Sequence, residues 1–185
     1  MTHPTVPQSI ALMMELHRGQ KDKSGEPYWQ HPFRVMRRLE AIDSMVVTHA
    51  ALLHDVVEDC DVGLDDLSKL GYDKRIVEAV SIVSRFKDGR DRDRTYMQWI
   101  EWIGAGRNLA AVLVKYADLL DNSAPARVAA LPPQYIELAE RHRRALELLA
   151  PRIPEELRST ILGGDLDVSP GEAVLTADRA GCSVS

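Results

Sequence analysis

The chain has 185 residues, which is the length of one domain of ordinary size. Apolar residues make up 45% of the chain and charged residues 28%, which is the balance typical of a folded globular protein. The formal net charge of −5 argues against a general nucleic-acid-binding surface. No apolar run approaches the roughly 18 residues that a membrane-spanning helix needs. The two cysteines follow no zinc-ribbon or CxxC spacing, so we expect a reducing, cytoplasmic setting.

The hydrophobic pattern predicts helices almost throughout the chain and no strand. The first predicted helix covers residues 7–18, and a second begins near Pro32, whose missing N–H costs nothing in a first helical turn. A third covers residues 45–59 and can be capped by Asp43 or Ser44. The remaining predicted helices are residues 64–70, 73–85, 94–104, 107–121 and 134–150. The sequence therefore predicts an all-α domain over residues 1–162.

Two segments lack helical periodicity. Residues 163–185 are rich in Gly, Ser and Asp, so we expect an extended or mobile C-terminal tail. Residues 84–94 interleave basic residues with Asp and predict a solvated connection between helices, with a lid over a phosphate-binding site as the alternative.

Two of the predicted helices are apolar on nearly every face, yet each carries acids in its second half. Asp55 lies in the helix of residues 45–59 and Asp118 in residues 109–121, and both are flanked by Leu, Val or Ala. An ionised carboxylate in such surroundings is unfavourable unless it is paired or coordinated. The pattern favours a metal site, with a structural ion pair in the core as the alternative.

Helical spacing groups further polar residues with these acids. Glu58 is i+4 from His54 and Asp59 is i+4 from Asp55, so one helix directs a His and three acids toward a common region. Such a cluster repels itself unless a cation lies nearby. Imidazole and carboxylate without thiolate suit manganese or ferrous iron better than calcium or a structural zinc. His31, at the point where a loop enters the second helix, is the best candidate for a ligand from a third segment.

The other polar residues near this pattern have simpler interpretations. His17 can interact with the C-terminus of the first helix, and His49 lies on a different helix face from His54. His142 follows one arginine and precedes two more, so we expect it at the surface. We interpret Cys60, next to the acid cluster, as a packing residue.

Three sequence blocks stand in the order typical of one known family. They are HRGQKDKSGEPYWQHPFRV at residues 17–35, AALLHDVVEDC at 50–60 and KYADLLDN at 115–122. Together they resemble the H…HD…D signature of HD-domain phosphohydrolases, above all the (p)ppGpp hydrolase domain of Rel/SpoT-type enzymes and the small alarmone hydrolases. The similarity spans roughly residues 8–150.

The resemblance implies an all-α HD-domain helical bundle that binds one divalent metal. The implied metal is manganese, with ferrous iron and magnesium as alternatives. The implied partner is a small phosphorylated nucleotide, with no nucleic acid and no membrane involved. The oligomeric state stays open. The implied metal ligands are His31, His54, Asp55 and Asp118.

The resemblance also assigns roles around the metal. Glu58 and Asp59 would position or activate the attacking water. Asn122 would help hold the nucleotide, and Lys23 and Ser24 would lie in a loop that lines its pocket. The implied reaction removes the 3′-diphosphate of (p)ppGpp and gives GDP or GTP and pyrophosphate. For the charge that develops on the phosphate, Lys23 and Arg34 are the first candidates to offset it.

Three positions depart from the family pattern. Asp22 stands where the family has an Arg that packs against the guanine, Leu119 replaces an Arg, and Asp121 replaces a His. These changes keep the expected metal ligands and alter the base pocket. Two alternatives therefore remain: an HD hydrolase of another nucleotide or phosphate ester, and a non-catalytic nucleotide-binding HD module.

Overall fold

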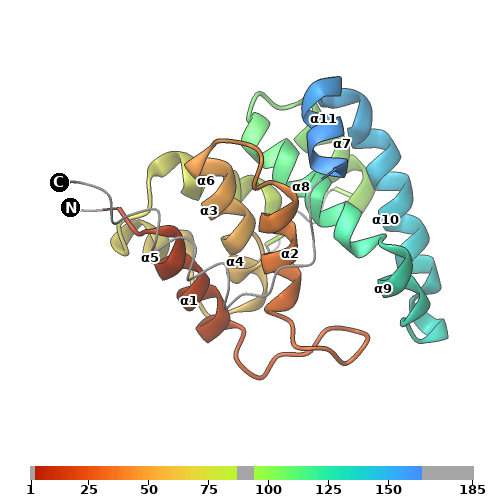
Figure 1. Cartoon of the computed structure of the whole chain (residues 1–185), viewed down its shortest axis with the longest axis horizontal. Helices are drawn as coiled ribbons and strands as arrows, with labels where there is room; N and C mark the ends of the chain where they lie inside the picture. The colour runs from red at the N-terminus through yellow and green to blue at the C-terminus, as the bar shows by residue number, and fades with distance from the viewer. Residues whose placement is uncertain (1–2, 87–93, 164–185) are drawn as a thin grey trace.

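A computed structural model describes residues 3–86 and 94–163, which form an all-helical fold (Figure 1). The described residues contain no strand, and an isolated bridge joins Lys21 to Pro27. None of the helices described is long and apolar enough to cross a membrane. The elements are α1 (Val6–Leu16), α2 (Gln30–Arg38), α3 (Met45–Leu53), α4 (Val56–Asp59), α5 (Leu64–Lys69), α6 (Lys74–Val83), α7 (Tyr96–Ala105), α8 (Leu109–Asn122), α9 (Pro125–Ala129), η1 (Pro133–Tyr135), α10 (Ile136–Leu149), η2 (Ala150–Arg152) and α11 (Glu155–Leu162).

The prediction of an all-α protein is confirmed, and most predicted helices agree with the structure to within two residues at each end. The short helices α9 and α11 were not predicted. The predicted tail lies outside the described residues beyond residue 163, and so do residues 87–93 of the mixed-charge connection.

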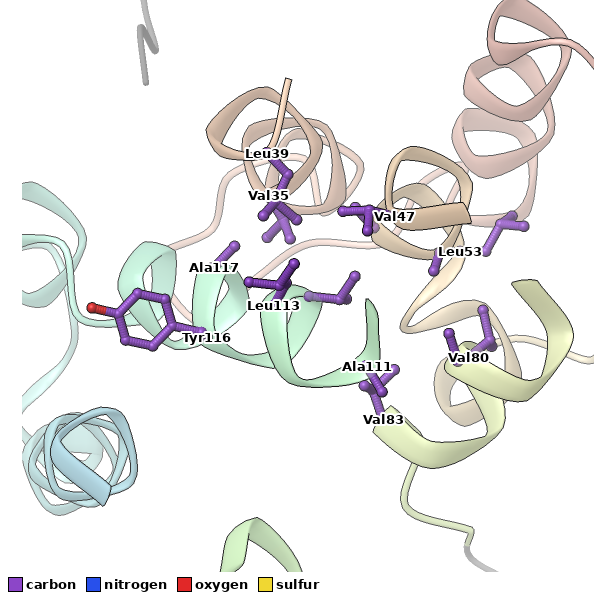
Figure 2. Packing of buried hydrophobic residues seen from close by; sticks show 14 of the residues in the cluster. Val35, Leu39, Val47, Leu53, Val80, Val83, Ala111, Leu113, Tyr116 and Ala117 are labelled. Carbon is purple, nitrogen blue, oxygen red and sulfur yellow. The ribbon is translucent and has the colours of Figure 1, made fainter. Parts of the chain in front are cut away.

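Helix α8 is the centre of the bundle. It packs against α2, α3 and α6 on one side and against α10 on the other (Figure 1). Every residue from Ala111 to Leu119 is buried. Figure 2 shows Leu113 and Ala117 of α8 directed toward Val35 and Leu39 of α2, where they form part of the hydrophobic core. The helix that carries Asp118 is thus held on two sides by apolar packing.

Side-chain caps fix where the two central helices begin. Ser44 precedes α3, and its hydroxyl accepts a hydrogen bond from the N–H of Val47. Asn108 precedes α8, and its side-chain oxygen accepts one from the N–H of Ala111 at 3.0 Å. Each cap satisfies an N–H that lacks a partner within the helix. Of the two caps considered for the third helix, the structure uses Ser44.

The prediction of one continuous helix over residues 45–59 is wrong. The helix is interrupted at His54 and Asp55, between α3 and α4. His54 Nδ1 donates a hydrogen bond to the carbonyl oxygen of Ala51 at 2.8 Å, and the carbonyl oxygen of His54 accepts one from Ser84 Oγ at 3.2 Å. Two carbonyls at the interruption therefore have side-chain partners. The interruption redirects the chain at the two residues of the HD dipeptide.

Ser84 offers a test of what holds this interruption. Its hydroxyl is buried and also donates to the carbonyl oxygen of Val80 at 2.8 Å. We expect Ser84→Ala to lower the free energy of unfolding by about 1 kcal/mol, because a buried carbonyl loses its partner. Ser81→Ala on the same helix is the control and should change stability by less than about 0.5 kcal/mol. Urea denaturation measures both, and equal effects would contradict the assigned role of Ser84.

Candidate metal centre

The four side chains predicted as metal ligands meet in one place. His31 comes from α2, His54 and Asp55 from the interruption between α3 and α4, and Asp118 from α8. His31 Nε2 lies 3.1 Å from Asp118 Oδ1 and 3.6 Å from Asp55 Oδ2. His54 Nε2 lies 2.9 Å from Asp55 Oδ2 and 3.8 Å from Asp118 Oδ1. Two imidazole nitrogens and two carboxylates thus converge on a common point, with the two histidines and Asp118 buried.

The hydrogen bonding of His54 indicates a cation at this point. Its Nδ1 must carry a proton, because its partner, the carbonyl oxygen of Ala51, only accepts. In the neutral ring Nε2 is then a bare lone pair, buried and without a hydrogen-bond partner among the described residues. It nevertheless faces Asp55 Oδ2 at 2.9 Å, so two acceptors confront each other unless a proton or a metal ion intervenes. The donor set therefore fits a divalent metal.

Asp121 orients the ring of His31 by bonding to the ring nitrogen that faces away from the other candidate ligands. Asp121 Oδ2 lies 2.7 Å from His31 Nδ1, which leaves Nε2 directed toward Asp55 and Asp118. Arg34 bonds to both Asp121 oxygens, through Nε at 2.7 Å and Nη2 at 3.1 Å, and Arg127 Nη1 bonds to Oδ2 at 2.7 Å. Burial opposes the charge of Asp121, but His31 and Arg34 outweigh it and lower the pKa of this carboxyl. A carboxylate behind a ligating imidazole fixes the ring and strengthens it as a ligand.

Asp121→Asn tests this positioning role. An amide has the same shape but no charge, so both the orientation and the basicity of His31 should suffer. We expect the affinity for Mn²⁺ to fall about 10–100-fold. The exposed Asp61, outside the cavity, supplies the control Asp61→Asn, which should bind Mn²⁺ as the parent does. Titration against a metal buffer gives both affinities, and unchanged binding by Asp121→Asn would remove Asp121 from the metal centre.

Two further acids lie beside the four candidate ligands. Glu58 and Asp59 belong to α4 and line the same cavity. Glu58 Oε2 accepts a hydrogen bond from the backbone N–H of Arg85 at 2.9 Å, and burial raises the pKa of Glu58. The hydroxyl of Tyr28 donates to Asp55 Oδ2 at 2.8 Å and to Asp59 Oδ2 at 3.3 Å. Tyr28 therefore connects the metal centre to the neighbouring acid.

The candidate ligands open into a cavity of about 520 Å³, the size of a small-molecule site. Of the predicted substrate-binding residues, Lys23 and Asn122 line this cavity, whereas Ser24 and Arg34 are not among its lining residues. Arg34 is instead bound to Asp121. The lining residues are Lys21, Asp22, Lys23, Tyr28, His31, Asp55, Glu58, Asp59, Arg85, Tyr96, Trp99, Lys115, Asp118, Asn122, Arg127, Leu131, Tyr135, Leu138, Arg141 and His142.

The structure explains the departure at Asp22. Asp22 Oδ1 accepts hydrogen bonds from the backbone N–H and the hydroxyl of Ser24, at 2.9 and 2.6 Å, and from the N–H of Glu26 at 3.1 Å. Its Oδ2 lies 3.5 Å from Arg127 Nη2. Asp22 therefore organises the loop between α1 and α2 and holds Arg127, which itself lines the cavity.

The predicted position of one histidine needs correction. His142 was expected at the surface, but it is partly buried and lines the cavity, because helix α10 turns it toward α8. His17 is the C-cap residue of α1, as predicted, yet its side chain is fully buried, with Nδ1 2.8 Å from Gln20 Oε1. His49 is buried away from the metal centre and bonds to Ser9.

The fold and this centre together define a helical protein with a candidate nitrogen–oxygen metal site in a polar cavity. The HD domain family model matches residues 9–124, more than half of the chain. The chain belongs to the HD domain family.

Relatives and a solved structure agree with this membership. The chain is 34% identical over 149 residues to a Vibrio cholerae protein named guanosine-3′,5′-bis(diphosphate) 3′-pyrophosphohydrolase, covering 78% of this chain and 20% of that protein. An Aquifex aeolicus protein of the same name is 31% identical over 121 residues, covering 63% and 17%. The chain thus spans about a fifth or less of the length of these curated relatives.

A similar solved structure is described as a metazoan ortholog of SpoT that hydrolyses ppGpp and plays a role in starvation responses. It matches with a TM-score of 0.66 and 25% sequence identity, over 87% of this chain and 94% of that one. At this coverage the two chains share the helical fold over most of their length.

Proposed function

We propose that this protein is a metal-dependent phosphohydrolase that removes the 3′-diphosphate of (p)ppGpp and releases GDP or GTP and pyrophosphate. The observation that carries the proposal is the convergence of four candidate ligands and two further acids at one end of a nucleotide-sized cavity. The names of the relatives and of the similar solved structure support the choice of substrate.

His31, His54, Asp55 and Asp118 would hold the metal. Imidazole and carboxylate donors without a thiolate suit Mn²⁺, with Fe²⁺ and Mg²⁺ as alternatives. When bound, a divalent metal acts as a Lewis acid on the phosphate and lowers the pKa of water.

Glu58 and Asp59 are the candidate groups for handling the proton of the attacking water. Both carboxylates line the cavity next to Asp55, and neither is needed to complete the four candidate ligands. A carboxylate within hydrogen-bond reach of the nucleophilic water can orient it and accept its proton. Tyr28, which donates to Asp55 and Asp59, would hold these two carboxylates in a fixed relation.

Lys115 and Asn122 hold Asp118 in place. Lys115 Nζ lies 2.6 Å from Asp118 Oδ2, and Asn122 Nδ2 donates to Asp118 Oδ1 at 2.5 Å. Asn122 therefore has a partner in the metal centre in addition to the nucleotide role that the family resemblance assigns to it. The positive charge of Lys115, which lines the cavity, would also offset charge on a reacting phosphate.

The first test is a product assay on the full chain loaded with Mn²⁺. We expect ppGpp to be converted to GDP and pyrophosphate, resolved by anion-exchange chromatography, and a chelator to stop the reaction. GDP and GTP without a 3′-phosphate serve as controls and should remain intact. No turnover of ppGpp by protein with confirmed metal content would reject the proposed substrate.

A second candidate is an HD hydrolase that acts on another nucleotide, and Asp22 is the observation that favours it. This carboxylate stands where the family has an Arg that contacts the guanine. It accepts a hydrogen bond from the backbone N–H of Ser24 in its own loop and forms an ion pair with Arg127. The same assay with adenosine 3′,5′-bis(diphosphate) separates the two candidates. Preference for the adenine substrate would support the second.

A further inference from the structure

Helix α10 supplies a basic wall to the cavity, and Arg141 is its central residue. Arg141 lines the cavity, and its guanidinium lies over the ring of Tyr96, 4.4 Å from the ring centre. Its Nε is buried and has no hydrogen-bond partner among the described residues. Stacking on an aromatic ring fixes the plane of the guanidinium and leaves N–H groups available for paired bonds to two oxygens of an anion such as phosphate.

His142 and Lys23 belong to the same wall. Burial lowers the pKa of His142 to about 4, and the positive charges of Lys115, Arg141 and Lys23 act in the same direction, whereas Asp118 opposes them. Lys23 comes from the loop between α1 and α2, with its ammonium 5.6 Å from the centre of the Tyr135 ring. Three cations, Lys115, Arg141 and Lys23, and one carboxylate, Asp118, act on His142.

Three of the four other cations that line the cavity are already engaged, and Lys21 is the exception. Lys115 is paired with Asp118, Arg127 with Asp121 and Asp22, and Arg85 donates to the carbonyl oxygen of Arg94. In contrast, no carboxylate within residues 3–86 and 94–163 forms an ion pair with Arg141 or Lys23. A partly buried guanidinium without a counter-charge is unfavourable, so this wall is suited to an anion that arrives from solution.

We propose that Arg141, His142 and Lys23 form a second anion subsite, which binds the phosphate group of the substrate that is not cleaved. This inference rests on the proposed function, because it requires a substrate with two separate phosphate groups. The acid cluster of α4 and α8 repels phosphate except through a metal, whereas the wall of α10 attracts it directly. In the proposed arrangement the scissile group lies against the acidic metal ligands and the retained group against the basic residues of the wall.

This arrangement determines which group is hydrolysed. In ppGpp the retained group is the 5′-diphosphate, and binding it at Arg141 leaves the 3′-diphosphate to face the metal centre. A nucleotide bound the other way round would exchange the two groups and present the wrong one. Arg141 therefore acts as a specificity-determining residue that needs no contact with the reacting phosphorus.

Two substrates that differ only at the 5′ position test the subsite. They are ppGpp and guanosine 3′-diphosphate with a free 5′-hydroxyl, and the variant is Arg141→Gln in the Mn²⁺-loaded full chain. We expect the KM for ppGpp to rise at least about 10-fold, with kcat within about 3-fold, since a charge-assisted phosphate contact is lost from binding. The KM for the 5′-hydroxyl substrate should not change. Equal changes for both substrates, or none for ppGpp, would overturn the subsite.

Arg144→Gln is the matched control. Arg144 lies on the same helix, is exposed and is not a lining residue of the cavity, so its replacement should leave both KM values unchanged. A comparison of thermal unfolding for the two variants shows whether Arg141→Gln retains its fold. If Arg141→Gln does not retain its fold, Arg141→Lys replaces it in the test. Lysine keeps the positive charge but lacks the paired N–H groups of the guanidinium, so it should raise the KM for ppGpp and leave the KM for the 5′-hydroxyl substrate unchanged.

GDP binding separates this inference from the proposed function, because it needs no turnover. GDP carries only the 5′-diphosphate, so calorimetry on the Mn²⁺-loaded chain should show binding that weakens at least about 10-fold in Arg141→Gln. If ppGpp is not hydrolysed but GDP binding depends on Arg141, the proposed function fails and the subsite stands. If ppGpp is hydrolysed and GDP binds equally to both proteins, the subsite alone is overturned.

Discussion

Asp118→Asn is expected to remove both metal binding and a large part of the stability of the fold. Asp118 is a candidate ligand, so the affinity for Mn²⁺ should fall by more than the roughly 100-fold that loss of a ligand's hydrogen-bond partner causes. Its Oδ2 also lies 2.6 Å from the buried ammonium of Lys115. Removing one partner of a buried ion pair lowers the free energy of unfolding by about 3–5 kcal/mol. Metal content and urea denaturation measure the two losses separately.

The double variant Lys115→Met/Asp118→Asn separates the ligand from the ion pair. Methionine has a similar length and can pack against Trp99, over whose ring the ammonium lies at 4.8 Å. We expect this variant to recover most of the lost stability, because no unpaired charge remains, and still to lack metal and activity. Recovery of metal binding together with stability would show that Asp118 acts only as an ion-pair partner.

Asp59→Asn and Glu58→Gln are expected to reduce kcat about 10²–10⁴-fold, the usual contribution of a group that handles a proton. Neither residue is among the four candidate ligands, so the metal content should stay near one equivalent. Amides keep the shape of the carboxylates and cannot accept the proton of the attacking water. Full activity in either variant would remove that residue from the reaction.

Asp61→Asn is the control for both, because Asp61 follows α4 closely but is exposed and outside the cavity. It should keep both the kcat and the metal content of the parent. Loss of metal in Asp59→Asn, with Asp61→Asn unaffected, would place Asp59 among the ligands rather than beside the water.

The sequence predicted the features that depend on local spacing. Apolar periodicity and caps such as Ser44 located most helices, and acids inside apolar helices pointed to the region where Asp55 and Asp118 meet. The interruption at His54 could not be predicted. One of its contacts is a bond from Ser84, which lies 30 residues further along the chain.

The residues of the site that the sequence did not predict are likewise placed by contacts between segments far apart in the chain. Asp121 bonds to His31 across 90 positions, and Tyr28 bonds to Asp55 across 27. Asp121 had one local signal, because it lies three residues after Asp118 and so near the same face of α8. For Arg141 and His142 there was no comparable signal, since the packing of α10 against α7 and α8 turns them toward the cavity.

The carboxylates around His31 make protons and metal ions competitors for one site. Burial opposes the charge of His31, but its hydrogen bonds to Asp118 and Asp121 outweigh burial and raise its pKa from an ordinary 6.5 to about 9. Without metal, the protonated ring therefore stabilises the fold fully below about pH 6.5, and this contribution disappears as the pH rises through about 9. A metal ion must displace that proton, so metal affinity rises with pH until His31 is deprotonated above about pH 9. In acidic solution the protonated ring of His31 thus neutralises the neighbouring carboxylates. In alkaline solution a bound metal ion takes over this role within the same fold.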